Sequence, residues 1–203
     1  MGKKKTYSGY TTGTAESLLL DAGAFFLNFK VDTDTFETAV KAGKLLGATK
    51  GGGEFAAVPS IRQIEVDGVK GKAKGLEVID SWDVSIKANV LEIKKESLAK
   101  ALCASETDSE TSEKYDIIKA KNYIELEDYI DNVTWVGTLS GSEEPVIIQI
   151  YNAINSDGLT LTTADKAEAV IAMTFNGHYK DSDLDTPPFA IYYPKVSSTT
   201  KGE

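Results

Sequence analysis

The sequence predicts a mainly β fold: two packed antiparallel sheets, forming a sandwich or a partly open barrel, with one or two short flanking helices. Apolar and polar residues alternate with a period of two along much of the chain, as in strands with one buried face. The longest such stretch is residues 61–93, where Asp67-Gly68, a pair typical of tight hairpin turns, separates two β-rich runs. Helical spacing is confined to two short segments.

Within residues 61–93, the expected turn at Asp67-Gly68 is followed by alternation over residues 69–79, which predicts a strand. A second break at Asp80-Ser81 leads into another strand, whose buried face would carry Trp82, Val84, Ile86, Ala88 and Val90. Its opposite face is polar, without an interruption that would form a pocket, and consists of Asp83, Ser85, Lys87 and Asn89.

The remaining segments predict an N-terminal arm, a β domain and a tail, over residues 1–16, 17–195 and 196–203. Residues 18–29 predict a strand broken near Ala22-Gly23, although a buried helix would have a similar length. We expect further strands at 115–121, 133–140, 146–154, 167–179 and 189–193; the fourth of these would bury Ala169, Ile171, Met173 and Phe175. The acidic segments 106–113 and 123–132 predict a solvated loop and a connector.

The two helical segments are residues 35–46 and 95–104. Asp34 or Thr35 can cap the first helix, and Gly47 is expected to end it. The second helix would place Cys103 on its apolar side as a small core residue. Residues 48–55 contain three consecutive glycines and predict a flexible loop.

Composition excludes several classes of function. The chain has 22 basic and 31 acidic residues and a formal net charge of −9, which argues against a basic nucleic-acid-binding surface. No apolar run approaches the ~20 residues that a membrane span requires, and no signal peptide is visible, so we expect a reducing cytoplasm as the site of synthesis. One cysteine and one histidine exclude an intramolecular disulfide and the usual zinc ligand sets.

The motifs that suggest chemistry are weak. Lysine precedes the glycines at 50–53, whereas a phosphate-binding loop needs Gly-Lys-Ser/Thr at the start of a helix. Asp181–Asp185 resembles the start of a calcium loop, but Thr186 and Tyr192 occupy its required glycine and glutamate positions. His178 is more readily a polar surface residue than a catalytic base. We therefore expect no enzyme activity, catalytic residue, metal or cofactor.

Five runs of the sequence resemble the major tail tube proteins of long-tailed phages and prophages of Gram-positive bacteria. They are Leu45–Phe55, Ile61–Gly75, Val78–Ile93, Tyr129–Ala153 and Asn176–Lys195. The similarity extends from about residue 18 to residue 195 and includes no short catalytic signature. It implies an Hcp-like tube fold, in which six subunits form a ring, rings stack, and one sheet of each subunit joins a barrel around a channel for the genome.

The resemblance also implies the partners and the location. These are further copies of the chain, the tape measure, tail-tip and tail-terminator proteins, and double-stranded DNA that passes without specific binding; the protein would be in the virion tail after assembly in the host cytoplasm, with no membrane partner. Six copies at −9 would carry −54, and acids near the lumen would keep DNA mobile. Candidate lumen-facing residues are those of the polar strand face named above. Candidate inter-subunit contacts are Thr6, Tyr7, Tyr10, Lys50, Gly51, Gly52, Gly53, Phe55, Lys70, Lys72 and Lys74.

The sequence leaves three alternatives open. An enzyme with a cryptic site would need His178 or a pair of acids in a cleft. A tube subunit of a contractile or secretion system would share the same fold. A carbohydrate- or surface-binding β-sandwich accessory protein of a tail would need an exposed aromatic platform, for which Tyr192 and Tyr193 are the available candidates.

Overall fold

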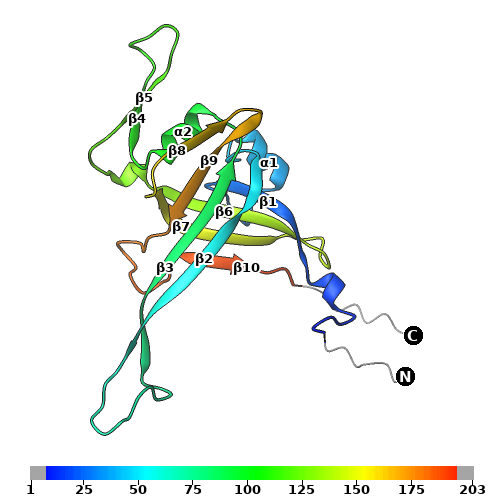
Figure 1. Ribbon diagram of the computed structural model, residues 1–203, viewed down its shortest axis with the longest axis vertical. Helices are drawn as coiled ribbons and strands as arrows, with labels where there is room; N and C mark the ends of the chain where they lie inside the picture. The colour runs from blue at the N-terminus through cyan, green and yellow to red at the C-terminus, as the bar shows by residue number, and fades with distance from the viewer. Residues whose placement is uncertain (1–7, 196–203) are drawn as a thin grey trace.

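The computed structural model describes residues 8–195 and confirms the expected mainly β architecture. An eight-stranded antiparallel sheet folds over on itself, and a separate two-stranded hairpin and two short helices are attached to it (Figure 1). The strands are β1 Leu19–Leu27, β2 Thr49–Gln63, β3 Glu77–Val90, β4 Ser105–Asp108, β5 Ile117–Ala120, β6 Ile130–Leu139, β7 Val146–Asn155, β8 Thr160–Ala164, β9 Ala167–Asn176 and β10 Phe189–Tyr192. The helices are α1 Phe36–Lys41 and α2 Lys95–Ala101, with 3-10 turns η1 Thr14–Glu16 and η2 Leu126–Asp128.

The large sheet consists of two four-stranded halves. Sheet I has the order β1–β6–β7–β10, and sheet II has the order β8–β9–β3–β2. The halves meet where the end of β7 pairs with β9, at Ile154↔Asn176 and Asn155↔Phe175. Because each sheet has an apolar face, the two halves bury those faces against each other in the manner of a sandwich.

The core lies between the two sheets. On β3, alternate side chains from Val84 to Val90 are buried, as their spacing predicts, and Trp82 is half-buried against the same core. Ile171, Met173 and Phe175 on β9 are also buried, as expected. Each fully buried Val, Ile, Met or Phe side chain stabilises the fold by ~1.5–3 kcal/mol relative to an exposed position.

Strand β1 contains the expected break, and the helical alternative for residues 18–29 is wrong. Its register with β6 shifts between Leu20 and Ala24, and Gly23 has a φ of 69°. A Cβ on Gly23 would collide with the indole of Trp135, whose Nε1 donates a hydrogen bond to the carbonyl oxygen of Ala22 at 2.9 Å. Glycine therefore allows this close approach of the two strands.

Helix α1 begins at its expected cap but is shorter than predicted. The hydroxyl of Thr35 accepts a hydrogen bond from the backbone N–H of Thr38, and the hydroxyl of Thr38 accepts one from Thr35 N–H. The helix ends at Lys41, and Gly43, with a φ of 70°, is the terminating glycine in place of Gly47. Residues 44–46 instead run alongside β1.

Helix α2 is also shorter than predicted, and this changes the position of the cysteine. The helix ends at Ala101, so Cys103 lies beyond it. Cys103 has a left-handed φ of 68° and is only half-buried. The prediction of a core cysteine on the apolar side of the helix was therefore wrong.

The glycine-rich segment 48–55 is not a flexible loop, because most of it forms the first part of β2. Gly53 pairs with Ala88 of β3, and the register shifts between Thr49 and Gly53, so the glycines form an irregularity in a strand. A Cβ on Gly53 would collide with the carbonyl oxygen of Lys87 and the ring of Phe25. The absence of a side chain thus serves packing here.

The expected strand over residues 69–79 is largely a loop. β2 ends at Gln63 and β3 begins at Glu77, leaving residues 64–76 as a long connection, closed by a hydrogen bond from Ile64 N–H to the carbonyl oxygen of Leu76 at 2.7 Å. Three glycines with positive φ, namely Gly68, Gly71 and Gly75, interrupt the extended backbone. Lys70, Lys72 and Lys74 therefore lie on a loop and do not share a strand face.

Smaller differences concern the short strands. β4 occupies the first part of the acidic segment 106–113, which was expected to be a loop throughout, and β5 confirms the strand expected near 115–121. β8 was not predicted; its five residues are all exposed. β9 ends at Asn176, before His178.

Candidate functional site

The outer face of sheet II is not covered by another element among the described residues. In Figure 1, β2, β3, β9 and β8 lie in front, and no helix or loop crosses them. Asp83, Ser85, Lys87 and Asn89 all project on this side, because they alternate with the buried residues of β3. Their partners across the ladders are Val58, Ala56 and Glu54 on β2 and Asn176, Thr174 and Ala172 on β9. The four residues predicted from the sequence thus form one row on a mostly polar face.

The charges on this face nearly balance. Lys87 lies 3.7 Å from Glu54, and Lys50 lies 2.8 Å from Glu168. The Lys50 hydrogen bond holds the pKa of Glu168 below its ordinary value. With Asp83, these side chains comprise two lysines and three acids, so most of the net charge of −9 lies elsewhere. Both ion pairs are exposed and contribute little to stability.

Sheet II has strand edges without a ladder partner. Within residues 8–195, β2 forms a strand ladder only with β3, and β8 only with β9. An edge strand presents unpaired backbone N–H and C=O groups, which can pair with another chain. The edge of β2 is long, from Thr49 to Gln63, and β1 approaches only part of it.

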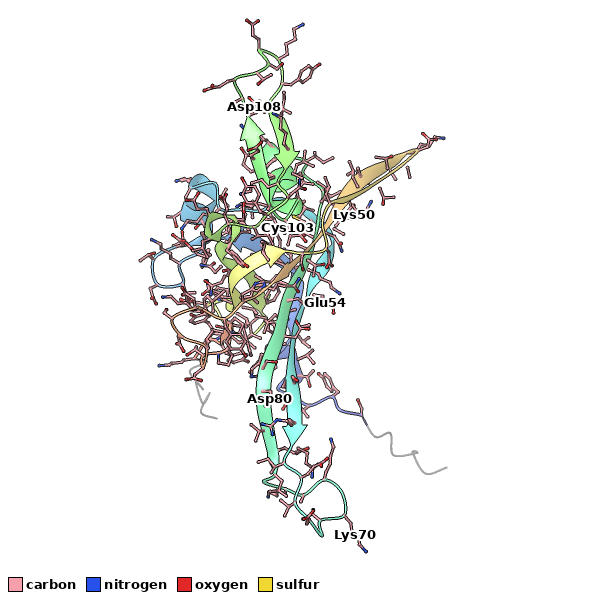
Figure 2. All side chains as sticks on the ribbon, turned by 90° about the vertical axis from the view of Figure 1, so that its left-hand side faces the viewer. Lys50, Glu54, Lys70, Asp80, Cys103 and Asp108 are labelled. Carbon is pink, nitrogen blue, oxygen red and sulfur yellow. The ribbon has the colours of Figure 1, made fainter. Side chains whose placement is uncertain are left out.

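β2 and β3 extend past the two packed sheets, which are called the body from here on. The extension is a projecting hairpin, defined here as residues 58–81. It carries the 64–76 loop at its tip, where Lys70 lies, and Asp80 lies on β3 toward the body (Figure 2). Its exposed apolar side chains include Ile61 and Ile79, which pair across the ladder and are 55% and 51% exposed. An isolated two-stranded hairpin is marginally stable in water, and exposed apolar patches mark interaction sites. The projecting hairpin therefore presents an apolar surface for which this chain alone provides no cover among the described residues.

The other candidate contact residues are distributed between β2 and the N-terminal arm. Gly51, Gly52, Gly53 and Phe55 line a cavity of about 330 Å³ at the junction of β1 and β2, which also includes Trp135. Phe55 is half-buried against the core, with its ring centroid 5.9 Å from that of Phe189. Tyr10 is 72% exposed, whereas Thr6 and Tyr7 lie outside the described residues.

The side chains considered above for catalysis or metal binding are His178, Cys103 and the acids near Asp183. Nδ1 of His178 is 3.0 Å from the carbonyl oxygen of Asn152, and the imidazole packs edge-on against Tyr129. Burial raises the pKa of the Cys103 thiol, which disfavours its thiolate form. Asp183 accepts hydrogen bonds from two backbone N–H groups of its own turn. In the part of the chain that the structure describes, no group of three or more His, Cys, Asp or Glu side chains could hold a metal ion.

One surface was missed by sequence reasoning. η2 and the segment after β9 form a groove of about 410 Å³, lined by Leu126, Tyr129, Asp131, His178, Lys180 and Asp181, among others. Leu126 is 87% exposed, the most exposed large apolar side chain among the described residues. The signal was present in the sequence, because Tyr123, Ile124 and Leu126 interrupt an acidic connector.

The segment at this groove is fixed by an ion-pair cluster. Nζ of Lys121 lies 2.8 Å from carboxylate oxygens of both Glu125 and Asp128. The contacts with Asp128 and Glu125 raise the pKa of Lys121 above its ordinary value, and Asp128 has the larger effect. The position of η2 is therefore set by charge-assisted contacts to the residue that follows β5.

Comparison with known proteins adds no identification. No protein-family model matches the sequence, and no curated protein gives a significant match to it. Within residues 8–195, the structure contains no helix long and apolar enough to cross a membrane.

Proposed function

We propose that this chain is a structural subunit of a phage tail tube that self-assembles into stacked hexameric rings around a channel for DNA. The observation that carries the proposal is the outer face of sheet II, which is uncovered, mostly polar and bounded by strand edges. Six copies of its four strands, joined edge to edge, would supply 24 strands. Barrels of about 16–18 strands already enclose an aqueous channel.

The chemistry of this face suits a channel for a duplex. DNA carries a negative charge every ~1.7 Å of its axis, so a basic lining would retain it. The side chains in the row from Asp83 to Asn89 are polar, and the charges around the row nearly balance. Under this proposal the row faces the lumen, and the duplex passes without specific binding.

Other surfaces are assigned to contacts between subunits. The projecting hairpin and the N-terminal arm would contact neighbouring copies, because Tyr10 and the apolar side chains of the hairpin are exposed in the single chain. The tape measure, tail-tip and tail-terminator proteins would be further partners in the virion tail, after assembly in the host cytoplasm. The proposed role requires neither catalysis nor a cofactor.

Negative-stain electron microscopy of the purified protein over a concentration series, with light scattering in parallel, tests the proposal. We expect hollow tubes or six-membered rings. If only monomers form, tape-measure and tail-tip proteins are added as nucleating partners. A chain that remains monomeric with those partners contradicts the proposal.

One observation favours a second candidate function, that of a carbohydrate- or surface-binding tail accessory protein. Phe36, Tyr192 and Tyr193, which are 53%, 39% and 60% exposed, line a cavity of about 420 Å³. Exposed aromatic rings with polar groups are suited to ligand recognition. Binding of the monomer to host surface polysaccharide, lost in Tyr193→Ala, would support this function over the tube.

A further inference from the structure

The groove next to η2 combines apolar surface with negative charge. Leu126 and Tyr129 provide apolar surface, and Asp131 and Asp181 provide carboxylates. Neither carboxylate forms an ion pair with a lysine or arginine within residues 8–195, although Lys180 also lines the groove. Three further acids of η2 and its cap adjoin Leu126, and only two of them pair with Lys121. The surface is therefore suited to a ligand that is both apolar and cationic.

The 64–76 loop combines exposed apolar side chains with three lysines and two acids, Glu65 and Asp67, so its positive charge is concentrated from Lys70 to Lys74. Val66 and Val69 are 49% and 42% exposed. Among the described ion pairs, none includes Lys70 or Lys74, whereas Lys72 lies 3.7 Å from Glu77. The loop is at the tip of the projecting hairpin, and the groove is on the body, so the loop is held away from the groove of its own chain (Figures 1 and 2).

We infer that the 64–76 loop of one copy docks in the η2 groove of a second copy. Val66 and Val69 would cover Leu126 and Tyr129, and Lys70 and Lys74 would pair with Asp131 and Asp181. The inference rests on the proposed function, for which it names one contact between copies.

The two surfaces differ, so the contact is heterologous. Each copy offers one loop and one groove. In a row of docked copies, a loop is therefore free at one end and a groove is free at the other. Such head-to-tail contacts propagate as an open filament unless their rotation closes a ring. A single docking contact of this type would thus connect copies along a stack.

A charge exchange between two variants tests the inference. The loop variant is Lys70→Glu with Lys74→Glu, and the groove variant is Asp131→Lys with Asp181→Lys. Each variant alone places like charges at every contact, so its association should be at least tenfold weaker than that of wild-type protein by sedimentation velocity. An equimolar mixture should associate again, because a loop variant and a groove variant satisfy each other's contacts. A matched control, Lys41→Glu with Lys114→Glu, makes the same charge change as the loop variant at exposed positions elsewhere and should associate normally.

The outcomes separate this inference from the proposed function. Wild-type tubes together with normal assembly of both variants would overturn the docking contact and leave the tube proposal standing. Loss of association that the mixture does not restore would also overturn it. If the wild-type chain is monomeric, a fluorescently labelled peptide of residues 62–78 is titrated with full-length protein. Anisotropy should then show binding that is at least tenfold weaker with the groove variant; equal binding, or none to wild type, contradicts the inference.

Discussion

Strand β3 has two halves with the same backbone conformation and different surroundings. From Trp82 to Val90, side chains alternate between the core and the outer face, whereas every side chain from Glu77 to Ser81 is exposed. The exposed half also contains apolar residues, among them Ile79. Within β3, only Ser85–Val90 pair with β9. The exposed half of β3 therefore lacks both a second neighbouring strand and a facing sheet.

The difference shows that strand formation and core formation are separate in this protein. The ladder between β2 and β3 continues from Ala88 to Glu77, through the body and the projecting hairpin. The break predicted at Asp80-Ser81 is therefore wrong: Asp80 is only a bulge, where the register shifts within one strand. Only the part that faces sheet I buries apolar surface, which is the main stabilising contribution to folding. The body should therefore account for the stability of the single chain, and the projecting hairpin should matter for contacts with other chains.

The strongest test of this division is a cavity in the body. Ile86 is fully buried on β3, and Ile86→Ala should lower the free energy of unfolding by about 2–5 kcal/mol. Urea unfolding followed by circular dichroism measures the change. Ser85→Ala, on the outer face of the same strand, should change it by less than about 0.5 kcal/mol. If Ile86→Ala lowers the free energy of unfolding by less than about 1 kcal/mol, Ile86 does not belong to the stabilising core.

A smaller loss of unfolding free energy is expected from adding a side chain in the glycine-rich part of β2. Gly53→Ala should cost about 1–3 kcal/mol, because the added methyl group meets the Phe25 ring and the Lys87 carbonyl oxygen. Thermal or urea unfolding measures it, and Gly9→Ala is the control, since a Cβ at Gly9 meets nothing within 4 Å. Equal stability of both variants would show that this strand segment adjusts freely.

Substitutions in the projecting hairpin should have the opposite effect: little change in the stability of the monomer and a large loss of association. Replacing the cross-strand pair Ile61 and Ile79 by serine should change the unfolding free energy of the monomer by less than about 0.5 kcal/mol per site. Association measured by light scattering should weaken at least tenfold, because the apolar contact surface is lost. A monomer destabilised by several kcal/mol would mean that the hairpin belongs to the folding unit.

The smallest effect concerns an ion pair beside α1. The hydrogen bond from Lys44, together with one from Lys30 N–H, lowers the pKa of Asp34 from its ordinary value of 3.8. A lowered carboxyl pKa stabilises the fold above 3.8, and this contribution is lost as pH falls through the lower folded value. Lys44→Met should therefore reduce Tm slightly at pH 7, and the difference from wild type should narrow below pH 3.8. Lys41→Met is the control, and a difference independent of pH would contradict the assignment.

Local patterns predicted the elements whose structure depends on near neighbours. The alternation from Trp82 to Val90 and the cap at Thr35 were visible because a strand face and a helix start are determined within a few residues. The glycine run was misjudged because its requirement comes from Phe25, a residue on a different strand. Glycines 68, 71 and 75 had the opposite effect and ended a strand that alternation alone had predicted.

The two candidate surfaces also differ in whether their residues are close together in the sequence. The row from Asp83 to Asn89 lies on one face of one strand, as the alternation predicts, and its position at a lumen stays a prediction. The η2 groove combines residues near 126–131 with residues near 178–181, far apart in the sequence. They meet because the side-chain amide of Asn152 on β7 donates to the His178 carbonyl oxygen at 2.9 Å, a contact that no local pattern reveals.

The continuity of β3 has a mechanical consequence. A pull on the 64–76 loop along the hairpin axis would pass through two extended backbones into the six residue pairs that join Ser85–Val90 to β9. Sliding β3 against β9 requires those pairs to break together, whereas a sideways pull peels them one at a time. The hairpin is thus a tether that resists axial tension far better than lateral force.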